Sequence, residues 1–334
     1  MSERRAPEIA HLGPIELLTP RPQESLEFFT EMMGMELVHQ EGRSAYLRGW
    51  DDYQVWSLKL TESPQAGMGW CGFRAWSEEA LERRVALIEA SGLGRGWQDR
   101  GDLGLGRAYA FEDPDGHRFK LYSEVERYRK PVETDYKNVH GKQPNRAVAV
   151  KRFDHLNILA GDVRAQRDFC VDVLGYREYE RIELDDGTLG GSWMSVTIAA
   201  HELIYTRDAY APQGARGRLH HAAFWVDTRE ECLRAADIWI ENEVFVEFAP
   251  SKHNVAQGFF LYGYEPGGNR VEVTSGGRLV YAPDEPCVVW TESDRKKGQA
   301  WHNPTVATFH TYGTPPFEPT DQGKPEQGDG AAAG

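Results

Sequence analysis

The chain has 334 residues, of which 40% are hydrophobic, so it is long enough for two or three domains with sizeable cores. Its 38 Lys and Arg residues against 52 Asp and Glu residues give a net charge of −14, and no long basic run interrupts this balance. This charge excludes nucleic acid and an anionic membrane surface as partners. The sequence also lacks an apolar run of about 20 residues and a secretory leader pattern in residues 1–7. We therefore expect a soluble, cytoplasmic protein.

The predicted elements repeat along the chain. Residues 9–38 predict a strand, a loop and a helix with one apolar face, closed by a glycine. Residues 69–93 predict a strand and a capped helix, and a β-hairpin follows at 108–124. The first pattern returns at 153–179, and the second returns within 219–277. These repeats predict an α+β fold of four βαβββ modules, paired into two similar domains.

A polar stretch that contains proline and lacks periodicity separates the second repeat from the third. We accordingly place the domains at residues 1–135 and 151–288, with a linker at 136–150. Residues 289–334 begin as an irregular, aromatic-rich segment and end rich in proline, glycine and charge, which predicts a disordered end. The sequence leaves open whether this segment closes a pocket as a lid, with candidates Trp290, Arg295, Lys296, Trp301, His302 and His310.

The internal repeat allows equivalent positions in the two halves to be compared. In the second half these positions hold His155 and His221, each on the first strand of a module, and Glu272 on a last strand. Two imidazoles and one carboxylate form the facial triad of a non-haem Fe(II) site, which leaves further coordination positions open. The same ligands also suit Mn(II), so the ligand set does not separate the two metals.

The corresponding positions of the first half hold His11, Trp70 and Lys120. Neither an indole nor an ammonium group binds a divalent ion. The first domain is therefore predicted to be free of metal, and His11 is interpreted as a core or surface histidine with ordinary hydrogen-bond partners.

Three stretches in the second half carry a resemblance to a known family: LHHAAF at 219–224, GNRVEV at 268–273 and the longer SKHNVAQGFFLYGYEPGGNRVEV at 251–273. They resemble the type I extradiol ring-cleaving dioxygenases, the catechol 2,3-dioxygenase group of the vicinal oxygen chelate superfamily, and the likeness extends over residues 8–310. The resemblance implies the vicinal oxygen chelate fold, in which each domain is a curved mixed sheet around a cavity. It also implies cleavage of a catechol by O2 at an Fe(II) centre, giving a 2-hydroxymuconic semialdehyde-type product.

The resemblance assigns roles to three further residues. Tyr262 and His253 would hydrogen-bond the substrate, and His201, in the stretch SWMSVTIAAHELIY, would act as an acid–base group on the oxygen side of the metal. The implied partners are a catechol and O2, and the implied assembly is a homo-oligomer, either a dimer or a tetramer. Two alternatives stay open: a non-catalytic protein that binds or sequesters aromatic compounds, and a 4-hydroxyphenylpyruvate-type dioxygenase, which the long signature does not suit.

Other histidines receive structural interpretations. His220 neighbours His221 on a strand, so the two side chains are expected to point to opposite faces, which makes His220 a packing residue or a neighbour of the ligand. His117 and His140 are expected to be solvated. No arginine lies shortly before His253, which favours an uncharged catechol unless Arg295 folds into the pocket.

Overall fold

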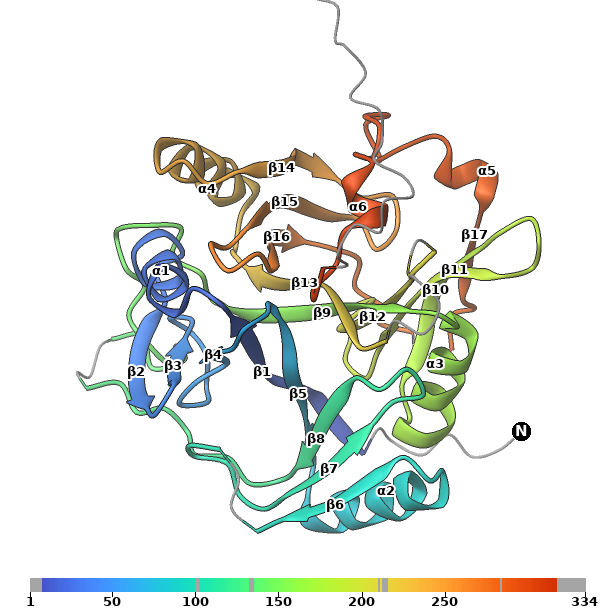
Figure 1. Cartoon of the computed structure of the whole chain (residues 1–334), viewed down its shortest axis with the longest axis horizontal. Coiled ribbons are helices and arrows are strands. Elements are labelled where there is room, and N and C mark those ends of the chain that lie inside the picture. The colour runs from blue at the N-terminus through green and yellow to red at the C-terminus, as the bar shows by residue number, and fades with distance from the viewer. Residues whose placement is uncertain are drawn as a thin grey trace, which may run out of the picture.

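The structure is a computed structural model that describes residues 8–99, 102–131, 135–209, 211, 216–282 and 284–316 (Figure 1). Four βαβββ modules follow one another, as predicted. The first contains β1 (Ile9–Thr19), α1 (Pro22–Glu27), the π-helix η1 (Phe28–Met32), β2 (Glu36–Glu41), β3 (Ser44–Arg48) and β4 (Leu58–Glu62). The second contains β5 (Gly67–Ala75), α2 (Glu78–Ala90), β6 (Gly94–Gln98), β7 (Ala108–Glu112) and β8 (Arg118–Tyr122).

The second half repeats this order of elements. The third module contains β9 (Arg152–Ala160), α3 (Val163–Phe169), the π-helix η2 (Cys170–Leu174), β10 (Arg177–Glu183), β11 (Leu189–Ser195) and β12 (Leu203–Arg207). The fourth contains β13 (Arg218–Trp225), α4 (Arg229–Glu241), β14 (Val246–Lys252), β15 (Gly258–Tyr264) and β16 (Arg270–Gly276). A last segment adds β17 (Val288–Thr291), α5 (Glu292–Arg295) and α6 (Thr308–Thr311).

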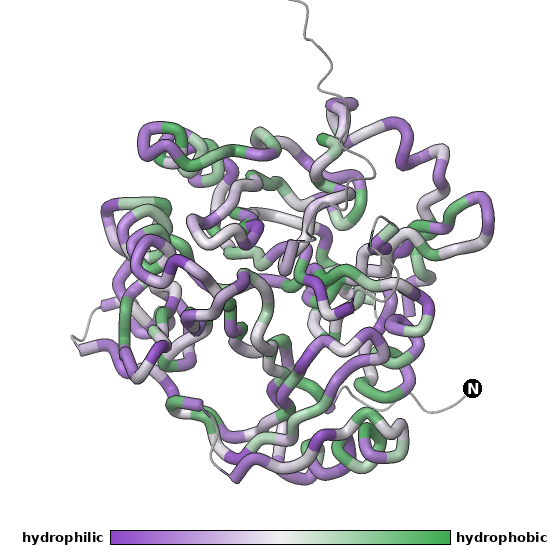
Figure 2. Tube along the Cα trace, in the orientation of Figure 1, coloured by the Kyte–Doolittle hydropathy of each residue, from purple (hydrophilic) through white to green (hydrophobic). Residues whose placement is uncertain are grey.

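Each half forms one mixed sheet. The strand order is β2-β3-β4-β1-β5-β8-β7-β6 in the first sheet and β14-β15-β16-β13-β9-β12-β11-β10-β17 in the second. At the centre of each sheet, the first strands of its two modules pair in antiparallel fashion, β1 with β5 and β9 with β13, and each also pairs in parallel with the last strand of its own module. Figure 2 shows hydrophobic residues along many of these strands and hydrophilic residues on many of the outer loops. The fold expected from the repeats is confirmed.

Local sequence explains where the helices begin. Ser77 caps α2 by accepting a hydrogen bond from the backbone N–H of Ala80, and Thr228 forms a capping box with Glu231 at the start of α4. Gly175 ends η2 in the left-handed conformation that glycine adopts at little cost. The helices then bury apolar faces against the sheets, as the spacing of their hydrophobic residues predicts.

One continuous hydrophobic core joins the two sheets. The helix of the first module packs on the fourth module, since the Phe28 ring lies 5.9 Å from Trp239. The helix of the third module packs on the second, where Phe169 lies 6.2 Å from Phe111. Each half therefore buries apolar helix surface against the other half, and the second sheet is held in a fixed position relative to the first.

The prediction that His117 is solvated is wrong. Its ring is 1% exposed: Nδ1 lies 2.8 Å from an Asp113 carboxylate oxygen, and Nε2 lies 3.2 Å from the backbone oxygen of Arg218 in the other half. The Tyr205 hydroxyl donates to the same carboxylate. The turn that carries His117 looks exposed in isolation, and only the packing of the two halves covers it. His140 is exposed, as expected.

The predicted linker ends inside the core. Val148 and Val150 are buried, and their backbone N–H groups donate to the carbonyls of Met32 and Met33. The final segment also returns to the protein: β17 pairs with β10, and the backbone of Thr314 pairs with Leu219. The predicted disordered end lies largely outside the described residues. Among the described residues, no helix has the length and apolar character required to cross a membrane.

Candidate metal centre

Three neighbouring strands bring the predicted triad together. His155 lies on β9, His221 on β13 and Glu272 on β16. The Glu272 Oε2 atom lies 3.0 Å from His155 Nε2 and 3.1 Å from His221 Nε2, and the two Nε2 atoms lie 3.3 Å apart. All three side chains are buried, and Glu272 Oε2 faces the Nε2 atoms of both histidines. A buried carboxylate oxygen of this kind, facing two imidazole nitrogens, fits a divalent metal ion.

The electrostatics of the triad agree with a cation site. Although burial opposes the charged imidazole, the carboxylates of Glu272 and Asp154 raise the pKa of His155 to about 9. Burial lowers the pKa of His221 to about 4. Burial disfavours the Glu272 carboxylate, but the neighbouring His155 and His221 hold its pKa well below the ordinary value. Without metal the triad therefore holds one proton, which a divalent ion would displace.

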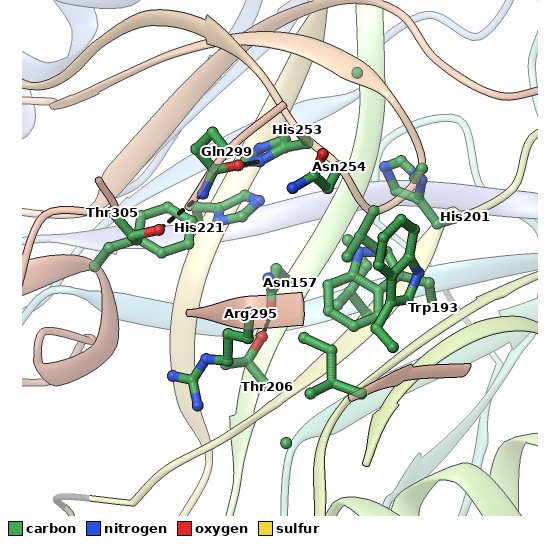
Figure 3. Close-up of a pocket in the computed structure, with 18 of the residues that line it drawn as sticks. Asn157, Trp193, His201, Thr206, His221, His253, Asn254, Arg295, Gln299 and Thr305 are labelled. Atoms are coloured by element: carbon green, nitrogen blue, oxygen red, sulfur yellow. Dashed lines mark hydrogen bonds between the residues drawn. The ribbon is translucent and has the colours of Figure 1, made fainter. Parts of the chain in front are cut away.

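A cavity of about 130 Å³ opens beside the triad. This volume is close to the roughly 150 Å³ of an engineered cavity that binds benzene, so it suits one aromatic ring. Figure 3 shows residues from several elements around it, with His253 and Gln299 near His221, and His201 beside Trp193. The predicted residues His201, His253 and Tyr262 all line this cavity together with the triad.

The hydrogen bonds of His253 determine its tautomer. Its Nδ1 lies 2.9 Å from the Gln299 side-chain oxygen, and its Nε2 lies 2.9 Å from the Tyr262 hydroxyl. The Gln299 amide nitrogen donates to Thr305, so its oxygen faces the histidine and accepts from Nδ1–H. Burial lowers the pKa of His253, which keeps the ring neutral. The Nε2 atom is then an acceptor for the Tyr262 hydroxyl, and burial raises the pKa of Tyr262 well above its ordinary value.

His201 lies on the other side of the triad. Its ring centroid is 4.5 Å from that of His155, and its buried Nδ1 has no hydrogen-bond partner. Burial lowers the pKa of His201 to about 3, so the ring is neutral. His201 also lines a second cavity, of about 290 Å³, between the two halves, and is thus the one predicted site residue that faces both cavities.

Glu202, next to His201, predicts a pH effect on stability. Burial raises its pKa from 4.5 to about 7, although the Val196 N–H and nearby hydroxyls oppose the shift. Between these values the native protein retains a proton that the unfolded chain has released, so stability falls as the pH rises. Glu202→Gln should therefore stabilise the protein by about 3 kcal/mol at pH 8, since one pKa unit is worth about 1.4 kcal/mol. The free energy of unfolding of the wild type and of Glu202→Gln, measured from pH 4 to 8, tests this expectation. Parallel pH profiles for the two proteins would contradict it.

The prediction for His220 is wrong in one respect. The side chains of His220 and His221 do not point to opposite faces: their Nδ1 atoms lie 2.6 Å apart. The reason is a β-bulge, because Leu219 pairs with Ile158 and His221 pairs with Asn157, so His220 is the extra residue. The bulge cancels the alternation of the strand at this point. His220 remains outside the triad, as a neighbour of the ligand.

In the described part of the first sheet, Lys120 and Trp70 stand at the positions that correspond to Glu272 and His221. Lys120 pairs with Gly72 in the first sheet, and Glu272 pairs with Ala223 in the second. The Lys120 ammonium donates to the Asp102 carboxylate at 2.7 Å and lies 4.0 Å over the Trp70 ring. An ammonium group thus supplies the positive charge that a metal ion would bring to the second sheet.

The predicted equivalence of His11 and His155 is wrong. Phe73 and Phe224 are equivalent positions, and they pair with Leu12 and Phe153, respectively. Leu12 therefore corresponds to Phe153. Two residues further along each strand, Pro14 is the counterpart of His155. A His-Leu pair occurs in both strands, at 11–12 and 155–156, but the two pairs lie three residues out of step, so their likeness does not mark equivalent positions. His11 instead lies 2.6 Å from the Tyr53 hydroxyl, as an ordinary partnered histidine.

The C-terminal segment supplies pocket residues that the sequence did not assign. Gln299, Thr305 and Phe309 line the cavity, as do three of the open candidates, Trp290, Arg295 and His310. The other candidates, Lys296, Trp301 and His302, are exposed and do not line it. Only the aromatic-rich composition of this segment pointed to the site. Irregular structure has no periodicity from which the inward-facing residues could be chosen.

The fold and the site together define a class of protein: paired βαβββ modules in which one of two similar sheets carries a His-His-Glu group at a cavity the size of an aromatic ring. The sequence matches the family described as the glyoxalase/bleomycin resistance protein/dioxygenase superfamily at residues 9–121 and 152–273. These matches cover more than half of the chain, and the chain belongs to this superfamily.

Individual relatives are similar over nearly the whole chain. A metapyrocatechase from Geobacillus stearothermophilus is 41% identical over 298 residues, covering 88% of this chain and 90% of the relative. A manganese-dependent 2,3-dihydroxybiphenyl 1,2-dioxygenase from Geobacillus genomosp. 3 is 34% identical, covering 90% and 95%. The solved complex of homoprotocatechuate 2,3-dioxygenase from Brevibacterium fuscum with 3,4-dihydroxyphenylacetate has a TM-score of 0.80 at 25% identity, covering 93% and 94%.

Proposed function

We propose that this protein is an extradiol dioxygenase, which cleaves the ring of a catechol with O2 at a non-haem divalent metal and gives a 2-hydroxymuconic semialdehyde-type product. The observation that carries the proposal is the convergence of the His-His-Glu group with His201, His253 and Tyr262 on one cavity the size of an aromatic ring. The similarity to a metapyrocatechase supports it. We favour Fe(II) as the metal, with Mn(II) as the alternative because one similar protein is manganese-dependent.

His155, His221 and Glu272 would hold the metal, and their single negative charge leaves the site cationic enough to attract a catecholate. When bound, the metal would supply Lewis-acid and oxygen-activating chemistry to a catechol in the cavity. The protein excludes water from this centre, since the three ligands are buried and aromatic side chains such as Phe309 and Trp193 line the cavity.

Tyr262 and His253 would orient the substrate. Tyr262 keeps its hydroxyl proton, which it donates to His253 Nε2 in this structure and can turn toward a substrate oxygen when a catechol binds. His253 contacts that hydroxyl and is held in turn by Gln299. On the other side, His201 is neutral and its buried Nδ1 has no hydrogen-bond partner, so this ring is the candidate for the acid–base step of ring cleavage.

Anaerobic reconstitution tests the function. The apoprotein is loaded separately with Fe(II) and Mn(II) and then mixed with O2 and either a panel of catechols or 4-hydroxyphenylpyruvate, while oxygen uptake and the yellow ring-cleavage product are recorded. We expect both signals with at least one catechol, and the metal that restores the higher turnover identifies the preferred ion. Binding of catechols without oxygen uptake would indicate a sequestration protein, and turnover of 4-hydroxyphenylpyruvate alone would indicate the other dioxygenase class.

Arg295 modifies the expectation of an uncharged substrate. The C-terminal segment does fold back, and Arg295 is the one permanent cation among the described residues that line the cavity. We therefore propose that a catechol with a carboxylate on its substituent is accepted, with this group directed toward Arg295 at the cavity mouth. Arg295→Gln should raise the KM for such a substrate about tenfold, the lower limit for losing a hydrogen bond to a charged group. The KM for unsubstituted catechol should not change, and equal shifts for both substrates would contradict the assignment.

The assembly and the location stay predictions. We propose a homo-oligomer, a dimer or a tetramer, in the cytoplasm. Exposed aromatic side chains such as Trp76, Phe245 and Tyr281 offer apolar surface for contacts between copies. Analytical ultracentrifugation of the purified protein tests the assembly, and a monomer at micromolar concentration would contradict it.

A further inference from the structure

His220 is the extra residue of a β-bulge in the second sheet, and the residue at the same position of the first sheet is different. The first sheet has the same bulge, because Met68 pairs with Leu17 and Trp70 pairs with Glu16. The extra residue there is Gly69, where a Cβ atom would collide with the Glu16 carboxylate. The bulge therefore forms without a histidine. An imidazole stands at this position only in the sheet that carries the metal ligands.

The His220 ring connects two groups. Its Nδ1 lies 2.6 Å from His221 Nδ1, and its Nε2 lies 2.7 Å from the backbone oxygen of Phe309. The Phe309 oxygen can only accept, so His220 Nε2 carries a hydrogen and donates it. In a neutral ring, His220 Nδ1 is then an acceptor, and His221 Nδ1–H must be the donor. This tautomer leaves His221 Nε2 unprotonated, and Nε2 is the atom that faces Glu272 and His155.

The Phe309 carbonyl is itself held in place. The Arg270 guanidinium donates to the backbone oxygens of His220, Thr308 and Tyr312, and it is fully buried in a pair with Glu247. The Phe309 ring packs 4.9 Å from Tyr262 and 4.7 Å from His220. The partly buried segment over the cavity is therefore tied, through Arg270 and Phe309, to the buried histidine behind the metal ligand.

We propose that His220 is a positioning residue. It donates a hydrogen bond to the Phe309 carbonyl and accepts one from His221, and it so holds His221 in the tautomer and orientation that bind the metal. Closure of the C-terminal segment is thereby linked to retention of the metal. This inference rests on the metal site of the proposed function, but it does not depend on the reaction or on the substrate.

The test measures how fast the full-length protein releases Mn(II) to a chromogenic chelator. His220→Leu removes both hydrogen bonds at similar volume, whereas the amide of His220→Gln can accept from His221 and donate to Phe309. His140→Gln, at an exposed histidine, is the matched control. Circular dichroism reports whether each variant is folded. If His220→Leu is not folded, His220→Asn replaces it, because its amide is too short to reach both partners.

We expect His220→Leu or His220→Asn to release Mn(II) about 10 to 100 times faster than the wild type, the usual cost of losing a partner of a metal-binding histidine. His220→Gln and His140→Gln should release Mn(II) at close to the wild-type rate. The electron paramagnetic resonance spectrum of bound Mn(II) should change only in His220→Leu or His220→Asn. Release at the wild-type rate from His220→Leu, or equally fast release from His220→Gln, would overturn the proposal. A wild-type protein that binds no divalent metal would instead overturn the proposed function.

Discussion

Replacing Glu272 with glutamine is expected to abolish ring cleavage. Glu272 provides the one anionic ligand of the triad, and its Oε2 faces both histidine nitrogens. A neutral amide binds a divalent ion weakly and leaves two imidazoles to hold it. We expect the rate to fall at least about 1000-fold, since the metal contributes several kcal/mol and each 1.4 kcal/mol is a factor of ten. Oxygen uptake measures the rate, and metal analysis after anaerobic reconstitution measures occupancy.

A matched substitution controls for the loss of a glutamate. Glu112→Gln, on β7 of the first sheet, removes a carboxylate that pairs with Arg95 near the surface. This variant should retain full metal content and activity. If Glu272→Gln kept its metal and its activity at the level of Glu112→Gln, the His-His-Glu group would not be the active centre.

The second large effect is expected for His201→Asn. The amide resembles the imidazole in size and polarity, but it cannot exchange a proton, so the acid–base step should be lost while the cavity is preserved. We expect kcat to fall about 100- to 10,000-fold, the usual contribution of a positioned proton donor or acceptor. Metal content and the anaerobic Kd for catechol should stay near their wild-type values, because His201 is not one of the three metal-facing groups.

The control for this variant is His11→Asn, in the second cavity that His201 also lines. His11 is hydrogen-bonded to Tyr53 and lies away from the triad, so its replacement should leave kcat unchanged. An unchanged kcat in His201→Asn would remove this residue from the mechanism. A parallel loss of metal would assign it a structural role instead.

The two sheets carry different groups at corresponding positions. In the first sheet, Lys120 and Asp102 form an ion pair at the place where the second sheet brings its ligands together. The first sheet neutralises its largely buried Asp102 carboxylate with an ammonium group, whereas the second sheet places two imidazoles beside its buried Glu272 carboxylate.

The sequence by itself determined the four modules and their pairing into two halves. The repeat and the family resemblance also predicted six site residues, and these line one cavity. Strand alternation, helix caps and the internal repeat are local signals, and each element forms where those signals place it. The equivalence of Trp70 with His221 and of Lys120 with Glu272 also follows from the repeat, since both pairs lie near landmarks that the two halves share.

Only the tertiary structure decided how His220, His117 and the C-terminal segment are placed. A β-bulge turns His220 toward His221, and no local pattern reveals which strand residue is the extra one. His117 becomes buried only when the second half packs over its turn. Gln299 and Phe309 reach the cavity from an irregular segment, and their positions depend on buried long-range partners such as Arg270. Contacts between distant parts of the chain set these positions, and such contacts leave no periodic trace in the sequence.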